Sequence, residues 1–378
     1  MNPATLGLST LIGTIVGAGI FGLPYVVARS GLLVALFYFV ILGICVTYLH
    51  LFFGEVCLRT PGKHRLIGYA GIYLGSLGKI VVAFSTIAGT IGALLAFLII
   101  GGDFLKIIIS PFANISPPWY HILFWLPLSL LVGAGIRLIA RVELVTTAAL
   151  FLMMGLIFLL ALPHISFANF SLFSSSNFFL PYGVILFSLI GWNAIPEIAE
   201  LFRKRQDKLQ FDNLIVVASA LAIFLYAAFA FSVVGVSGQE TTQEGLSGLL
   251  PFLGNGVIVL GAFFGLIAVG DSFLIMGSYL KNSFLHDFHM PAKLSLFITA
   301  VAPLVLYLVG FREFISVISV AGIIVGVVEG LVIIGLFLQA RAKGQRKPEY
   351  RVKVFAPVPF LIAFVLIGGT VAALVFSL

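Results

Sequence analysis

Residues 13–25 read GTIVGAGIFGLPY and lie inside the first long apolar stretch of the chain. Glycine is a poor helix former and proline lacks a backbone donor, so this composition weakens a helix in its middle. In the hydrocarbon of a membrane, each freed backbone group is costly unless a partner satisfies it. The stretch therefore predicts either a close-packed glycine face or a deliberate break in a membrane helix.

The composition indicates whether this helix lies in water or in a lipid bilayer. Of the 378 residues, 61% are hydrophobic and only 9% are charged, whereas a soluble domain carries roughly 25% charged residues. So few charges cannot cover a water-facing surface, and we predict an integral membrane protein in a lipid bilayer. In a membrane protein the net charge of +7 is related to how the chain is oriented across the bilayer, and no nucleic-acid partner is expected.

Eleven stretches are long enough to cross a bilayer, which takes about 20 apolar residues. They cover 5–28, 31–57, 78–109, 119–136, 142–162, 178–202, 211–236, 255–284, 292–310, 313–339 and 355–377. Segment 61–77 is polar at its start and predicts a loop with a short interfacial helix. No basic residue precedes Arg29, so we expect no cleaved signal peptide and a first span that stays in the mature protein.

The basic residues indicate how the chain is oriented. A cytoplasmic N-terminus places 18 of the 21 Lys and Arg residues in inner loops and leaves only Arg29, Lys106 and Arg312 outside. Basic residues resist translocation. The sequence therefore predicts a multi-pass protein of the cell (inner or plasma) membrane, with its N-terminus in the cytoplasm and its C-terminus outside.

A second weakened helix lies five spans after the first. Residues 187–202 read FSLIGWNAIPEIAELF, with Gly191, Asn193 and Pro196 near the middle of the span. Two interrupted helices at corresponding positions of two halves are typical of inverted-repeat transporters; a lone glycine cluster can instead be a packing face. We predict one domain over 1–378, with repeats at 5–162 and 178–339 and an extra helix at 355–377.

Broken membrane helices offer a way to bind a zwitterion. The N-terminus of a half-helix carries unpaired N–H groups and a positive dipole end, which suit a carboxylate. The freed carbonyls and helix C-termini suit an ammonium group or a cation. A substrate with both charges can thus be held without a charged side chain.

The motifs GAGIFGLP (17–24), ARSG (28–31) and GWNAIPE (191–197) resemble the amino acid–polyamine–organocation superfamily. The similarity is greatest to its tryptophan/tyrosine permease branch. It implies an all-α leucine-transporter fold of eleven helices, with helices 1 and 6 discontinuous. It also implies a substrate site, for which we predict these residues: Gly17, Ala18, Gly19, Ile20, Phe21, Gly191, Trp192 and Asn193.

Asp271 lies mid-span in LIAVGDSFLIMGSYL, where a carboxylate is costly and should face a cavity or a partner. It is a candidate cation ligand or proton acceptor, or else a structural polar contact. The pair Asp271-Ser272 resembles one in neurotransmitter transporters, which implies a Na⁺ site completed by the carbonyls of Gly13, Val16 and Ala268. Proton-coupled relatives often carry a lysine in the fifth span; 142–162 has none, which favours Na⁺ over H⁺.

Three further polar residues are candidates. Glu329, central in its span, is either a coupling or gating carboxylate or a neutral acid bonded to neighbouring backbone. Glu197 follows the second break by one turn and is a possible gating residue. Thr90 is a possible substrate contact, although hydroxyls in membrane helices commonly bond their own backbone.

These observations predict a function. The chain has no phosphate-binding loop and no zinc-ligand spacing, so we expect no enzyme, no catalytic residues, no cofactor and a gradient as the energy source. We predict a symporter that moves a neutral, aromatic or large apolar amino acid by alternating access, with Na⁺ favoured over H⁺. Alternatives are a proton-coupled or uncoupled exchanger and a non-transporting membrane sensor. The particular amino acid and the oligomeric state stay open.

Overall fold

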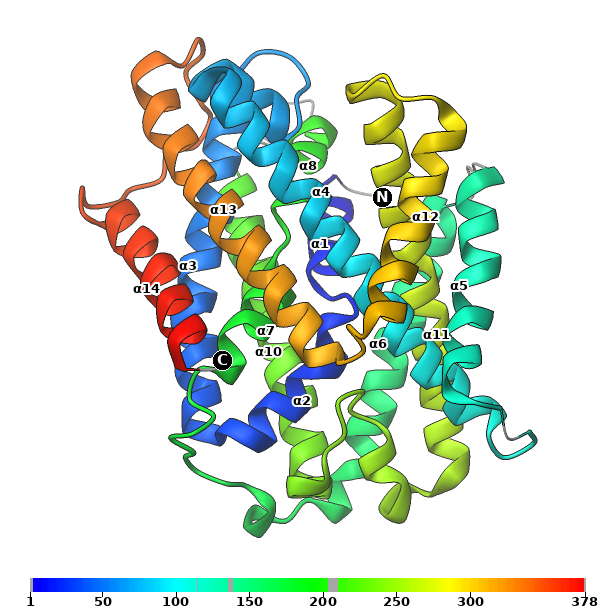
Figure 1. The fold of residues 1–378 in the computed structure, drawn as a ribbon. Coiled ribbons are helices and arrows are strands. Elements are labelled where there is room, and N and C mark those ends of the chain that lie inside the picture. Colours follow the sequence, from blue (N-terminus) through cyan, green and yellow to red (C-terminus); the bar gives the residue numbers. More distant parts are fainter. Residues whose placement is uncertain (1–2, 114, 135–138, 203–209, 377–378) are drawn as a thin grey trace.

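The computed structural model describes residues 3–113, 115–134, 139–202 and 210–376. Within these ranges every regular element is a helix (Figure 1). The α-helices are α1 (Pro3–Ile15), α2 (Gly19–Ser30), α3 (Leu32–Arg59), α4 (Leu66–Ile109), α5 (Pro117–Ala134), α6 (Ile139–Ala161), α7 (Leu180–Leu189), α8 (Ile195–Leu201), α10 (Phe211–Ser237), α11 (Leu250–Asn282), α12 (Ala292–Val309), α13 (Phe314–Lys343) and α14 (Val358–Phe376). The all-α expectation is confirmed for the described part of the chain.

The helices have the length and composition of membrane spans. Among the described residues, eight helices can cross a bilayer, or nine when α1 and α2 count as one bent span. The two other expected spans, 119–136 and 142–162, fall on α5 and α6, which border residues 135–138 outside the described ranges. Large apolar side chains such as Phe84, Phe224 and Phe364 are at least 67% exposed. This outward apolar surface suits lipid.

The first weakened stretch is a break between two helices. Helix α1 ends at Ile15, α2 begins at Gly19, and the two are bent by 54°. Both lie in the middle of the bundle (Figure 1). A Cβ added at Gly19 would lie 3.1 Å from the Cα of Ser188 in α7. Glycine is needed here because the backbones of α2 and α7 approach each other so closely.

The second weakened stretch also contains a change of helix. Helix α7 ends at Leu189, and a short 3₁₀ turn at Trp192–Ala194 leads into α8. Pro196 sits in the first turn of α8, where a missing N–H removes no intrahelical bond. The turn packs against α1 and α3, so the two breaks lie close to each other in the bundle.

Two long helices contain a glycine with left-handed backbone that separates a short segment from the span. Gly75 in α4 has φ of 75°, and Gly254 in α11 has φ of 78°. Residues 66–74 therefore form the short helix expected within 61–77. Helix α13 packs against α2 and α7 beside the breaks, and α4 packs against both α13 and α11, whereas α14 packs against α13 and α7 at the edge of the bundle (Figure 1).

Candidate functional site

A cavity of about 430 Å³ lies where the two breaks face α4, α11 and α13. Residues 13–19 form one wall, and Phe187, Ser188, Ile190 and Asn193 form a second. The long helices contribute the remaining walls, chiefly through apolar and small side chains. Segments distant in sequence thus enclose one site in the middle of the bundle.

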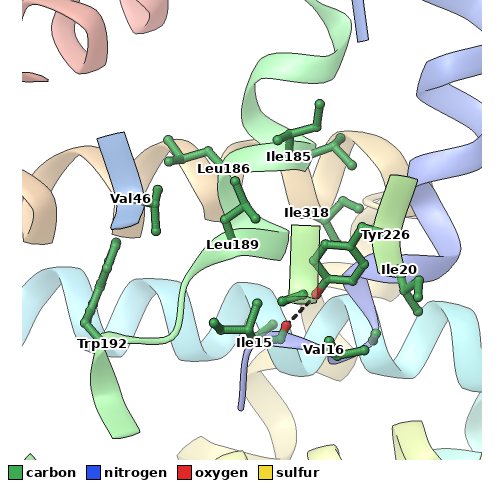
Figure 2. Close-up of a cluster of buried hydrophobic side chains, with 14 of the residues drawn as sticks. Ile15, Val16, Ile20, Val46, Ile185, Leu186, Leu189, Trp192, Tyr226 and Ile318 are labelled. Carbon is green, nitrogen blue, oxygen red and sulfur yellow. Dashed lines mark hydrogen bonds between the residues drawn. The ribbon is translucent and has the colours of Figure 1, made fainter. Parts of the chain in front are cut away.

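The cavity brings together all but three of the residues predicted for the site. Its walls include Gly13, Val16, Gly17, Ala18, Gly19, Phe21, Thr90, Asn193, Glu197, Ala268, Asp271, Ser272 and Glu329. Ile20, Gly191 and Trp192 do not contribute to the walls. The side chains of Ile20 and Trp192 are fully buried among other residues, and Figure 2 shows both in an apolar cluster between the helices.

The backbone of the first break leaves donors and acceptors beside the cavity. The N–H of Gly17 donates to the carbonyl of Ile15 at 2.9 Å. Within the described residues, the N–H groups of Ala18 and Gly19 donate to no backbone acceptor, and the carbonyls of Gly13 and Val16 accept no backbone bond. These groups match the expected arrangement of donors for a carboxylate and acceptors for a cation.

Glu329 of α13 holds the second break to the long helices. Its Oε2 accepts a hydrogen bond from the indole Nε1 of Trp192 at 2.6 Å, and its Oε1 accepts one from the Thr86 hydroxyl at 2.9 Å. The partners are therefore two side chains, rather than the neighbouring backbone that the sequence left as an alternative. Trp192 is buried and does not line the cavity, and its N–H is bonded to this carboxylate.

His50 of α3 supports the same break from the other side. Its Nε2 accepts the N–H of Gly191 at 3.2 Å, and its Nδ1 lies 3.2 Å from the Ser219 hydroxyl of α10. A ring nitrogen that accepts from an amide carries no proton, so the imidazole is neutral with its hydrogen on Nδ1. His50 fixes Gly191 in place without adding charge to the bundle.

The proposed cation ligands of α11 lie side by side at the cavity wall. Asp271 and Ser272 are both half-buried. The Ser272 hydroxyl donates to the carbonyl of Ala268 at 3.0 Å, which leaves its lone pairs available. Thr90 also lines the cavity, but its hydroxyl donates to the carbonyl of Thr86 at 2.7 Å, as commonly seen in membrane helices.

An aromatic layer closes the cavity at the α2 end. The ring of Phe21 packs edge-on against Phe104, with centroids 4.8 Å apart, and against Phe229, with centroids 6.5 Å apart. All three side chains are buried. Beyond this layer lies a separate polar cleft, to which Tyr25 and Arg29 of the same helix contribute.

The opposite end of the cavity carries charged side chains. Arg65, in the connection between α3 and α4, and Glu197 of α8 both line the cavity and are about half exposed. Arg65 binds Glu200 at 2.7 Å and lies 3.6 Å from Glu197. Partial burial by itself lowers the pKa of the Arg65 guanidinium, but the bond to Glu200 and the negative charges of Glu197 and Glu200 together outweigh this effect and raise the pKa. We call Arg65, Glu197 and Glu200 the charged mouth.

Several residues of the site were not singled out from the sequence. Thr86, His50 and Tyr226 were not among the residues predicted for the site. Each is a polar side chain in a predominantly apolar span, which is the available signal. That signal does not say which break a side chain supports, because the partners come from other helices.

A bundle of apolar helices around a central cavity, with polar backbone exposed at two breaks, defines a membrane transporter of small solutes. Comparison with known proteins agrees with this class. The chain belongs to the tryptophan/tyrosine permease family, whose model matches residues 1–376. The resemblance of its motifs to that branch is thereby confirmed.

Individual relatives support the same class. Glutamine transporter 2 of Aliivibrio fischeri is 23% identical over 336 residues, which are 86% of each chain. Among solved structures, that of MhsT in complex with L-phenylalanine covers 98% of both chains with a TM-score of 0.69 at 16% identity, which shows a shared fold. The relatives are transporters, so the expectation that this chain is no enzyme is confirmed.

Proposed function

We propose that this protein is a cation-coupled symporter of neutral amino acids, preferring aromatic or large apolar side chains. The observation that carries the proposal is the cavity itself. It is lined by Asp271 and Ser272 and by Ala18 and Gly19, whose N–H groups donate to no backbone acceptor within the described residues. A zwitterion and a cation can therefore bind next to each other and depend on each other.

The substrate class follows from the walls. Phe21, Phe53, Phe97 and Phe187 all contribute to the lining and favour a large apolar side chain. The substrate carboxylate would bind backbone N–H groups of the first break, and no basic side chain is needed for it. The relatives are described with glutamine and with L-phenylalanine, which are both neutral amino acids.

The coupling ion follows from the oxygen atoms near the first break. Gly13, Val16, Ala268, Asp271 and Ser272 all line the cavity, and the cation would bind the carbonyls of the first three and the side chains of the last two. Five oxygens with one carboxylate suit Na⁺. One sodium ion crossing 100 mV releases ~2.3 kcal/mol, enough for roughly 50-fold accumulation of substrate. If H⁺ is the coupling ion, Asp271 is the acceptor at the same place.

The fold supports alternating access between two halves. We propose that the chain forms eleven spans, with inverted repeats over 5–162 and 178–339 and one added helix. The breaks at residues 16–18 and 190–194 take corresponding places in these repeats. With the N-terminus in the cytoplasm, the charged mouth faces inward, and the aromatic layer closes the outer side.

Uptake by purified protein in proteoliposomes tests the function. Phenylalanine uptake should follow an inward Na⁺ gradient at constant pH and should be absent under a pH gradient without Na⁺. Asp271→Asn should raise the Na⁺ concentration for half-maximal uptake at least about tenfold, because an amide holds a cation more weakly than a carboxylate does. The matched control is Asp212→Asn, at the start of α10 and outside the cavity walls.

Each alternative has its own result in this experiment. Uptake under the pH gradient alone indicates proton coupling, and uptake only against internal amino acid indicates an exchanger. Phenylalanine that stabilises the protein thermally but never crosses the membrane indicates a sensor. Equal Na⁺ dependence of Asp271→Asn and the wild type would remove Asp271 from the cation site.

A further inference from the structure

Tyr226 of α10 contacts both helix breaks with one hydroxyl group. Its side chain is fully buried. The hydroxyl oxygen lies 2.5 Å from the carbonyl oxygen of Ile15, the last residue of α1, and 2.9 Å from that of Ser188 in the last turn of α7. Figure 2 shows the bond to Ile15, with Ile20 and Leu189 packed nearby.

Both carbonyls lack the intrahelical donor of a continuous helix because the helices are broken. In a continuous helix, the carbonyl of Ile15 would accept from residue 19 and that of Ser188 from residue 192. The Ile15 carbonyl has a second donor in the N–H of Gly17. For the Ser188 carbonyl, the Tyr226 hydroxyl is the only donor found in the described part of the chain.

The two carbonyls converge on one point, an arrangement that also suits a cation. Here the two carbonyls share the hydroxyl hydrogen of Tyr226, whose partial positive charge takes the place of a cation. The hydroxyl belongs to α10, which packs against α1, α2 and α7. One side chain therefore fixes the distance between the first break and the end of α7.

This distance matters for the cavity. Ile15 and Ser188 both line it, and Gly19 follows the first break in close contact with Ser188. A displacement of α7 relative to α1 would move the carboxylate-binding N–H groups away from the opposite wall. We propose that Tyr226 is a positioning residue that keeps the first break and the end of α7 at the distance needed for substrate binding. This proposal rests on the proposed function.

The test compares two tyrosines that each lose one buried hydroxyl. Tyr182 of α7 is also buried, and its hydroxyl donates to the carbonyl of Leu366 at 2.6 Å, away from the cavity walls. Both Tyr226→Phe and Tyr182→Phe should lower the melting temperature. Only Tyr226→Phe should raise the KM for phenylalanine, by about tenfold, with a maximal rate within about twofold of the wild type.

A rescue variant keeps the test informative if Tyr226→Phe does not fold. The unnatural residue p-aminophenylalanine at position 226 keeps the ring and offers two N–H donors, one for each carbonyl. It should keep the KM within about twofold of the wild-type value. A wild-type KM in Tyr226→Phe, the same KM change in Tyr182→Phe, or no rescue by the amino variant would overturn the proposal.

Binding separates this proposal from the proposed function. Thermal stabilisation by phenylalanine needs no transport, so it can be measured in every variant. If the wild type binds but does not transport, the symporter function fails while the role of Tyr226 is still read from the binding constants. If the wild type transports and Tyr226→Phe binds normally, only the role of Tyr226 fails.

Discussion

Glu329 illustrates how a carboxyl group can be accommodated inside a membrane bundle. A buried carboxyl group needs partners for both oxygens. Trp192 supplies one donor from the second break and Thr86 supplies another from α4. The residue therefore joins the long helices α4 and α13 to the break. The geometry assigns it first to holding Trp192 and leaves its coupling role as a prediction.

Two substitutions separate the bonds of Glu329 from its charge. Glu329→Gln keeps an acceptor for the Trp192 indole, and its amide can donate to the Thr86 hydroxyl. We expect substrate affinity within about threefold of the wild type. Glu329→Leu leaves the buried indole N–H unpaired and should weaken binding about tenfold or more. Titration of tryptophan fluorescence or calorimetry with phenylalanine measures both; a large loss in the Gln variant would instead assign the role to the charge.

At the scale of the element, the glycines of the first break have different tasks. A Cβ at Gly17 would meet no atom within 4 Å, whereas one at Gly19 would press against the backbone of Ser188. Gly17 thus faces the open cavity, and Gly19 permits the contact between α2 and α7. The sequence motif contains both glycines without distinguishing these tasks.

Substitutions at the two glycines should therefore fail in different ways. Gly17→Val should lower substrate affinity at least about tenfold, because the side chain fills the place of the carboxylate. Its melting temperature should stay close to that of the wild type. Gly19→Ala should lower the melting temperature, because α2 and α7 must separate. Thermal unfolding with and without phenylalanine measures both effects, and normal binding by Gly17→Val would contradict the assigned place of the carboxylate.

Hydropathy was sufficient to predict an all-α chain with many apolar helices, and the glycine-rich stretches coincide with the places where α1 gives way to α2 and α7 to α8. Apolar length is a local property, and glycine or proline in an apolar run is a local signal. The partners that stabilise the breaks could not be predicted in this way. His50 comes from α3 and Tyr226 from α10, and only the packing of these helices shows which carbonyl or N–H each one reaches. Trp192 was predicted to lie in the substrate site because the sequence does not show that its indole bonds to Glu329 of another helix.

For the whole molecule, the two ends of the cavity differ in the contacts that close or border them. The layer of Phe21, Phe104 and Phe229 contains no charge, so its rings can separate without leaving an unpaired ion. The side chains of the charged mouth are 25–57% exposed, and ion pairs of this kind contribute little and rearrange readily. Both ends thus suit a change between two conformations.

Sided labelling tests which end is open and which way it faces. The two cysteines, Cys45 and Cys57, are buried and should not react. Asn193 lines the cavity and is exposed, whereas Glu240 lies in the cleft beyond the aromatic layer. A membrane-impermeant thiol reagent should therefore label Asn193→Cys from the cytoplasmic side and Glu240→Cys from the outer side. Phenylalanine with Na⁺ should slow only the first reaction, because the substrate occupies the cavity. Labelling of both cysteines from one side would contradict the proposed orientation, and equal protection of both would contradict the placement of the substrate.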